Sequence, residues 1–239
     1  MISKILRKTA IGIMAAAMMM TVAGAMTTDT ANAATVRKSG DYKFVKYLNG
    51  VKIKEYTGKA KKVTIPATIA GKKVVAIGYS AFENNDNIKQ VKFPNSVFEI
   101  DNRAFAGCDK LKKVTLPKKL DKCDSYAFAE TALKSITIPE GIKEIENHTF
   151  DGCKKLKTVK LSEDVKIIDN GAFQNCEKLT TINLENIEEI GNMAFKNAVS
   201  LSGNLVLKNV TTVETKAFFG CSSISSVEFS DLLQKLGKC

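Results

Sequence analysis

The chain lacks tryptophan and has a single histidine, His148, among its 239 residues. One histidine excludes a metal site built from several imidazoles and a relay of two histidines. The six cysteines form no CxxC pair, which argues against a zinc site. Glycine loops that cradle phosphates are also missing. We therefore expect no cofactor and no bound metal.

Arginine is scarce as well, because only three of the 36 basic residues are arginine. Nucleic-acid recognition favours arginine forks and interleaved aromatic side chains. We therefore expect no nucleic-acid partner. Basic residues still outnumber acidic ones, and the formal net charge of +11 suits an acidic partner without identifying it.

The N-terminus has the pattern of an export signal. A basic start (Lys4, Arg7 and Lys8) precedes an apolar stretch from Thr9 to Ala25, and Ala31-Asn32-Ala33 follows as a small-residue cleavage pattern. A retained membrane anchor is the competing interpretation, but the stretch is shorter than the roughly 20 apolar residues that cross a bilayer.

The sequence therefore predicts a signal peptide over residues 1–33. No cysteine follows the apolar stretch to carry a lipid, and the C-terminus has neither a wall-sorting motif nor a second hydrophobic segment. We expect a secreted, extracellular protein with no membrane insertion of the mature chain, and cell-surface association stays open.

The rest of the chain is a repeat marked by the dipeptide Ala-Phe. Thr149-Phe150 fills one slot of the series, and successive phenylalanines lie 22 or 23 residues apart. The other six slots are Ala81-Phe82, Ala104-Phe105, Ala127-Phe128, Ala172-Phe173, Ala194-Phe195 and Ala217-Phe218. Such a fixed period is typical of solenoids, in which stacked units share one continuous core.

Each unit contains two local patterns. Ala, Phe and the residues three and six positions after Phe recur at helical spacing, which predicts a short helical segment. A pair such as Val91 and Phe93 then alternates with the period of a strand. Pro94, Pro117 and Pro139 directly follow such pairs and end them, because proline cannot donate to a strand ladder. A closing apolar residue completes the unit.

The predicted fold is an α/β repeat solenoid, a right-handed coil with one parallel β-sheet face and short helical segments. Seven coils at the inter-strand spacing of about 4.8 Å give a length of roughly 30–35 Å. Alternation around Asn49-Gly50, within Asp41 to Tyr56, predicts an N-terminal β-hairpin cap. Residues 34–73 are assigned to this cap and an incomplete first repeat, and residues 74–239 to about seven units of 22–23 residues.

The unit IGxxAFxxCxxLxxVxLPxxLxxI resembles the leucine-rich repeat of the BspA-like class, also called the Treponema pallidum type. The lead-in from Thr57 to Phe82 is also similar to the usual entry to such arrays, and the resemblance spans about residues 42–236. It implies a bacterial secreted or surface protein, in a family of which some members bind host matrix proteins, plasma proteins or other cells. It implies no catalytic residue and no shared ligand site.

The outward residues of the predicted strands are the candidate ligand-binding face. Solenoids commonly bind extended ligands on such a sheet. The alternative is that these residues are simply soluble residues that favour strands. We name an extracellular protein or an anionic glycan as the hypothetical partner. The twelve residues are Lys62, Thr64, Gln90, Lys92, Lys113, Thr115, Ser135, Thr137, Thr158, Lys160, Thr181 and Asn183.

The cysteines follow the repeat. Cys108, Cys153, Cys176 and Cys221 each lie three residues after the repeat phenylalanine, and Cys123 occupies a closing apolar position. Free cysteine behaves as a small buried hydrophobe, so packing explains all five. A disulfide between adjacent coils is disfavoured, because stacked side chains point in parallel.

No enzymatic activity is expected from the sequence. His148 lies in a variable turn, and no cysteine or serine is paired with it by a recognised spacing, so a solvated turn residue is the better interpretation. No pair of carboxylates or nucleophile–base set is distinct from the repeat background. Catalytic residues are therefore predicted to be absent.

The alternative function is that of a structural or self-associating solenoid without its own ligand. Leu232, Leu233 and Leu236 end the last coil without a visible polar cap. Cys239 lies outside the repeat and is expected to be exposed. Self-association is therefore predicted to use either the C-terminal edge or Cys239.

Overall fold

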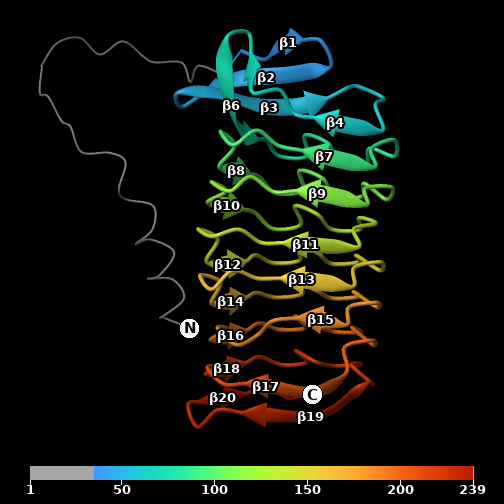
Figure 1. Ribbon diagram of the computed structural model, residues 1–239, viewed down its shortest axis with the longest axis vertical. Coiled ribbons are helices and arrows are strands. Elements are labelled where there is room, and N and C mark those ends of the chain that lie inside the picture. The colour runs from blue at the N-terminus through green and yellow to red at the C-terminus, as the bar shows by residue number, and fades with distance from the viewer. Residues whose placement is uncertain (1–34, 239) are drawn as a thin grey trace, which may run out of the picture. The chain divides into compact units, whose positions relative to one another are not determined.

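The computed structural model describes residues 35–238, so the predicted signal peptide over residues 1–33 and Cys239 lie outside the described residues. Within this range the chain winds into eight coils, and each coil contributes one front strand and one back strand (Figure 1). The front strands are β4 (Lys62–Thr64), β7 (Gln90–Lys92), β9 (Lys113–Thr115), β11 (Ser135–Thr137), β13 (Thr158–Lys160), β15 (Thr181–Ile182), β17 (Gly203–Leu207) and β19 (Ile224–Phe229). The back strands are β6 (Lys72–Ile77), β8 (Glu99–Ile100), β10 (Lys122–Cys123), β12 (Glu144–Ile145), β14 (Ile167–Ile168), β16 (Glu189–Ile190), β18 (Thr212–Val213) and β20 (Lys235–Leu236).

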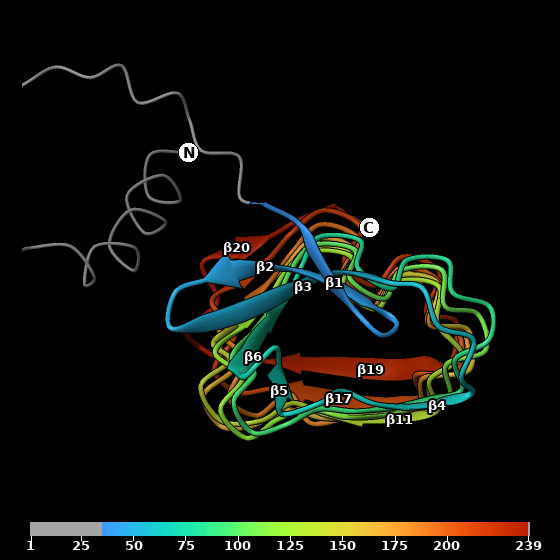
Figure 2. The same cartoon turned by 90° about the horizontal axis from the view of Figure 1, so that it is seen from above.

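The strands of both stacks are parallel and pair in short sheets. The front stack comprises β4-β7-β9, β11-β13-β15 and β17-β19, and the back stack comprises β6-β8-β10 and β12-β14-β16-β18-β20. On the front, Lys62 pairs with Gln90 and Gln90 with Lys113, and on the back Glu99 pairs with Lys122. Viewed along the solenoid axis, the coils superpose, with the front strands along one side of the core and the back strands along an adjoining side (Figure 2). The predicted solenoid with parallel strands is confirmed. The expected single parallel sheet is wrong, because the front strands divide into three sheets and the closing apolar residues form a second stack of mostly two-residue strands.

No helix occurs between residues 35 and 238, so the predicted short helical segments are wrong. The reason is backbone conformation, because two residues in every phenylalanine turn are left-handed, as Arg103 (φ 58°) and Gly107 (φ 68°) are around Phe105. A helix needs consecutive residues near φ −63°. The residues two before phenylalanine are Ser80, Arg103, Tyr126, His148, Gly171, Met193 and Lys216, and those two after it are Asn84, Gly107, Glu130, Gly152, Asn175, Asn197 and Gly220. This part of the chain accordingly offers no helix that could span a membrane.

The left-handed residues direct every second N–H toward the next coil. The Phe82 N–H donates to the Ala104 carbonyl at 2.8 Å, and the Asn84 N–H donates to the Ala106 carbonyl at 2.8 Å. The N–H of Glu83, between them, instead closes a local turn on the Ser80 carbonyl at 3.1 Å. A helix would use these N–H groups within its own segment. The turn conformation is favoured over a helix because its N–H groups bond neighbouring coils together.

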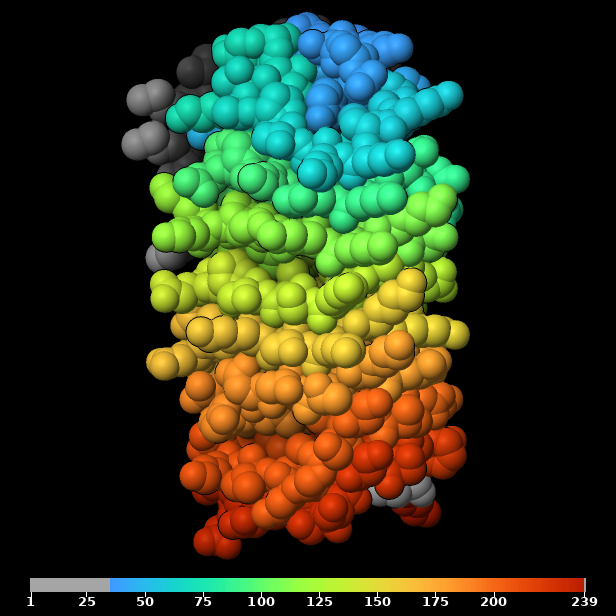
Figure 3. Space-filling model, turned by 45° about the vertical axis from the view of Figure 1, so that its right-hand side comes forward, coloured from blue at the N-terminus to red at the C-terminus, as the bar shows by residue number. Residues whose placement is uncertain are grey.

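The core is a column of phenylalanine rings that runs through the coils. Consecutive rings from Phe82 to Phe218 are stacked, with centroids between 4.7 and 5.9 Å apart. Such a pair contributes about 0.5–1.5 kcal/mol beyond its area burial. The space-filling view shows the coils as successive bands in contact (Figure 3). Each coil therefore depends on its neighbours for burial of its apolar side chains.

A hairpin extends the column at the N-terminal end. Strands β2 (Tyr42–Tyr47) and β3 (Gly50–Tyr56) pair antiparallel, and β1 (Arg37–Ser39) pairs with β2. β5 (Thr68–Ile69) pairs antiparallel with β6. Tyr56 stacks on Phe82 at 5.0 Å and so takes the position of the repeat phenylalanine.

The hairpin turn is displaced by one residue from the predicted Asn49-Gly50. Tyr47 pairs with Gly50, so Leu48 and Asn49 form the turn, and Leu48 takes the positive φ of 48°. Gly50 lies in β3 and faces β6, where a Cβ would overlap the Lys73 carbonyl oxygen. Close approach between strands, rather than turn chemistry, therefore requires this glycine.

An ion cluster joins the cap to the back strands. The Lys52 ammonium, on β3, lies 3.2 Å from Glu99 and 2.9 Å from Asp101, and it sits 3.9 Å from the centroid of the Tyr47 ring. Burial alone would raise the pKa of the Glu99 carboxyl, but the Tyr47 hydroxyl and Lys52 outweigh it, so this pKa is lowered. Burial is also the main reason why the pKa of Asp101 is raised.

Replacement of a left-handed glutamate by glycine should stabilise the solenoid. Glu130 has a φ of 57° and an exposed side chain. Glu130→Gly should raise the free energy of unfolding by about 0.5–1 kcal/mol, because glycine carries no Cβ penalty there. Glu140→Gly is the control, since Glu140 is exposed but not left-handed, and it should be destabilising. Urea unfolding measures the free energy of unfolding of both variants. A loss of stability in Glu130→Gly would contradict the backbone argument.

Removal of the cap lysine should weaken the fold in a pH-dependent way. Lys52→Met leaves Glu99 and Asp101 without their shared cation, and we expect a loss of about 2–3 kcal/mol at neutral pH. Because the pKa of Glu99 is lowered in the folded protein, its ionised carboxyl stabilises the fold at pH values above the ordinary carboxyl pKa. This stabilisation is lost as the pH falls. The difference between wild type and variant should therefore shrink in acid, as the carboxyls become protonated.

The control for this prediction is Lys43→Met on the same hairpin. Lys43 pairs with Glu55 at 2.7 Å, but both side chains are more than 40% exposed. An exposed pair is worth less than about 1 kcal/mol. Equal losses for the two variants in denaturant titrations would show that burial of the Lys52 cluster is unimportant.

Candidate functional site

The outward side of the front strands, here called the front face, brings the twelve predicted residues together. Their strands place them in two rows, as in Lys62–Gln90–Lys113 and Thr64–Lys92–Thr115. Ten of the twelve side chains are exposed, whereas Gln90 and Asn183 are half-buried. The geometry fits the predicted face. That these residues bind a ligand stays a prediction.

Asn183 differs from the other eleven, because its amide group is used within the fold. It lies one residue beyond β15, where its Oδ1 accepts from the Leu161 N–H at 2.8 Å and its Nδ2 donates to the Leu161 carbonyl at 3.1 Å. Asn183 therefore connects two coils, as a backbone pair would.

A second column of lysines beside the front strands was missed from the sequence. Its five members are exposed and occupy successive coils. Backbone hydrogen bonds link Lys61, Lys89 and Lys112 in one series, for example from Lys89 N–H to the Lys61 carbonyl at 2.7 Å, and Lys134 and Lys157 in another. The signal was present in the repeat, since the last four lie six or seven residues after a repeat phenylalanine. The members, here called the lysine column, are Lys61, Lys89, Lys112, Lys134 and Lys157.

Charge is partitioned between the two sides of the solenoid. On the front side, the lysine column and Lys62, Lys92, Lys113 and Lys160 make no ion pair within residues 35–238. On the back side, Lys122 lies 3.0 Å from Asp124, and Lys235 lies 2.8 Å from Glu214. The front lysines therefore have no acidic partner in the described chain. On the back some lysines are paired, but Lys72, Lys73 and Lys166 form no ion pair among the described residues.

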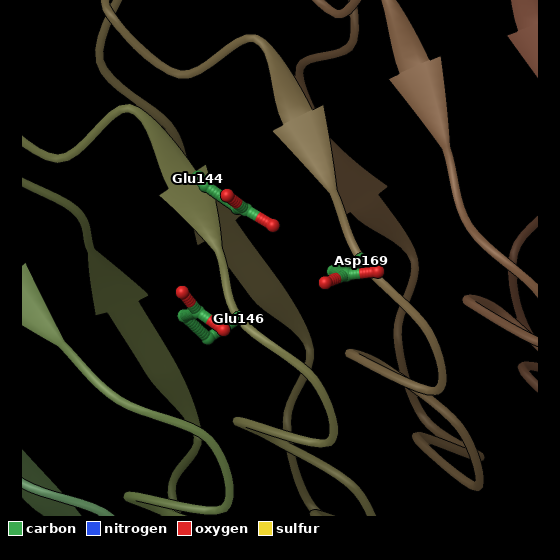
Figure 4. A group of neighbouring side chains, drawn as sticks. All are labelled: Glu144, Glu146 and Asp169. Carbon is green, nitrogen blue, oxygen red and sulfur yellow. The ribbon is translucent and has the colours of Figure 1, made fainter. Parts of the chain in front are cut away.

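An acidic group on the back strands is the one set of potential metal ligands among the described residues. Glu144 on β12, Glu146 just after it and Asp169 after β14 each offer an oxygen, and these atoms lie within 4.8 Å of one another (Figure 4). No sequence spacing indicates this group, because its members come from two coils. Calcium takes six to eight oxygen ligands, so three carboxylates alone do not assign a metal.

His148 is more ordered than a solvated turn residue. Its ring stacks on Tyr126 with centroids 4.7 Å apart, and its Nδ1 lies 3.0 Å from the Asp151 carboxylate. The ring also covers Gly171 of the next coil, where a Cβ would overlap it. These contacts give the histidine a structural role on the turn side of the solenoid.

The repeat cysteines combine packing with hydrogen bonding. All five described cysteines are unpaired, and four of the thiols donate to a phenylalanine carbonyl of the preceding coil. Cys108 reaches the Phe82 carbonyl at 3.0 Å, and Cys176 reaches the Phe150 carbonyl at 3.2 Å. The thiol therefore adds a polar link between coils to the packing expected from the sequence.

Comparison with known proteins gives a consistent family. Residues 75–202 and 188–239 match the model of the BspA type leucine rich repeat region, in six copies. No curated protein matches the chain. A leucine-rich repeat protein of T. pallidum is 25% identical, with a TM-score of 0.55 over 70% of this chain and 91% of that one. The pneumococcal vaccine antigen PcpA shares the fold at 18% identity, with a TM-score of 0.58 over 86% of this chain and 67% of that one.

The core thiols should be unreactive while the chain is folded. Burial raises the pKa of Cys108 to about 12 and the pKa values of Cys153 and Cys221 to about 11. Since the thiolate is the nucleophile, Ellman's reagent should label none of the five described cysteines of a Cys239→Ser protein at neutral pH. All five should react in urea. Thr137→Cys on the front face is the positive control, and rapid labelling of the folded Cys239→Ser protein would contradict this burial.

Proposed function

The chain belongs to the BspA-type leucine-rich repeat family, and we propose that it is an extracellular binding module whose front face holds a negatively charged ligand. The ligand is an acidic region of an extracellular protein or an anionic glycan. The observation that carries the proposal is the set of front-side lysines that form no ion pair among the described residues.

The physical argument concerns charge that the fold leaves uncompensated. Parallel in-register strands place like residues about 4.8 Å apart in neighbouring coils, so lysines in one column repel one another. Opposite charges within reach would relieve this repulsion, as Glu99 and Asp101 do for Lys52 on the back. A ligand with negative charge would supply them on the front and would be attracted over a distance in dilute salt.

Export supports an extracellular location for this ligand. The predicted signal peptide over residues 1–33 would direct the chain out of the cell. PcpA, which shares the fold, is described as a pneumococcal vaccine antigen. Surface or secreted placement of this chain is part of the proposal, as is its function as a scaffold without catalysis.

Self-association is a second candidate function. Leu232 and Leu236, on the last coil, are 56% and 57% exposed. Apolar exposure of this kind favours contact with another protein surface. Light scattering of the wild-type sample, with and without reductant, distinguishes this candidate, since it predicts a dimer or larger species.

Charge reversal on the front face should abolish ligand binding. We expect the wild type to bind at least one member of a panel of immobilised matrix proteins and sulfated glycans, and Lys62/Lys92/Lys113/Lys160→Glu to lose that binding by more than tenfold. The control, Lys72/Lys118/Lys119/Lys208→Glu, makes the same charge change at exposed positions elsewhere and should retain binding. Equal binding by both variants, or no binding by the wild type, would refute the proposed function.

A further inference from the structure

The lysine column runs along the solenoid axis and not along a strand. Backbone hydrogen bonds join three of its four steps, for example from Lys112 N–H to the Lys89 carbonyl at 3.0 Å and from Lys157 N–H to the Lys134 carbonyl at 2.9 Å. The step from Lys112 to Lys134 has no such bond, because β9 and β11 belong to different sheets. With about 4.8 Å per coil, the four steps from Lys61 to Lys157 cover roughly 19 Å. On the front side of each coil, the column lysine is accompanied by at most one lysine of the front face, as Lys112 is by Lys113. The charge is therefore arranged as a line across strands.

The line is confined to the N-terminal five coils. Thr180 takes the next position after Lys157, and its N–H donates to the Lys157 carbonyl at 3.0 Å. Farther on, β19 presents Glu228 on the front side, with its partner Val206 on β17. A ligand that follows the positive charge would lie from β4 to β13 and leave the last coils uncovered.

The rows beside the column carry hydroxyl groups. Thr115, Ser135, Thr137 and Thr158 are exposed on the front face and can donate or accept hydrogen bonds. None of the twelve front-face residues is aromatic. Single-stranded nucleic acids bind largely by stacking of bases on aromatic side chains, and this face offers no such platform. Hydroxyls beside lysines suit a chain that alternates hydroxyl groups with negative charges.

We propose that the ligand of the front face is a linear anionic polysaccharide that lies along the solenoid axis and contacts the lysine column, one lysine per coil. This inference rests on the proposed function and specifies its ligand. The polymer's negative charges would replace the counterions held by the column, and their release would make binding steeply dependent on salt.

The test compares two neutralised variants with heparin as the probe. The column variant is K61Q/K89Q/K112Q/K134Q/K157Q, and the control is K72Q/K118Q/K119Q/K208Q/K216Q, which removes five exposed positive charges elsewhere. Glutamine keeps most of the side-chain length, and circular dichroism checks that both variants fold. Affinity is measured for heparin fragments of increasing length and at several salt concentrations.

We expect wild-type affinity to rise with fragment length until the fragment spans five coils. The column variant should bind long heparin more than tenfold more weakly, and the slope of log K against log salt should become shallower by about 3 to 4, at roughly 0.7 per lost contact. The control variant should match the wild type in both affinity and slope.

Three outcomes would overturn the inference. Affinity that does not depend on fragment length would indicate a compact ligand, and wild-type binding by the column variant would place the polymer elsewhere. Tighter binding of a single-stranded oligonucleotide than of heparin would favour a nucleic acid. If the Lys62/Lys92/Lys113/Lys160→Glu variant still loses its panel ligand in any of these cases, the proposed function stands and only the polysaccharide is wrong.

Discussion

The backbone hydrogen bond between neighbouring turns is the constraint on which this structure depends. It requires a left-handed residue on each side of the repeat phenylalanine, and most of these residues are not glycine. The conformational cost is offset because the turn places its phenylalanine ring against the ring of the next coil. Neither the bond nor the ring contact exists in an isolated coil, so stability is a property of adjacent pairs of coils.

Fixed register has a second consequence, because it stacks each residue type upon itself. In the core this produces the phenylalanine column and the thiols that bond to the preceding coil. On the turn side it allows His148 to stack on Tyr126. On the front it sets lysine above lysine, where the same geometry is repulsive. A feature that repeats along the sequence thus becomes a continuous stripe on the surface.

The sequence predicted those features that depend on spacing and missed those that depend on backbone conformation. Apolar spacing located the coils, the front strands and the hairpin. Helical spacing around Phe105 was misleading, because the apolar pattern of an inward-facing turn is similar to that of a helix, and only φ at Arg103 distinguishes them. Gly50 was assigned to a turn because its contact with Lys73 is long-range. Likewise, Asn183 could not be recognised as a coil linker without its partner Leu161.

The alignment of front-side lysines in successive coils, beside rows that carry no carboxylate, favours a ligand over a purely solubilising role. Lysines that only kept the solenoid soluble would serve equally well on either side, and they could pair with carboxylates at little cost. On the back, Lys52 and Lys122 do so through Glu99, Asp101 and Asp124. On the front, the lysine column faces the hydroxyl-bearing rows with no carboxylate partner in the described chain. Lysines aligned across successive coils with no carboxylate beside them are the arrangement expected where an external anion completes the charge balance.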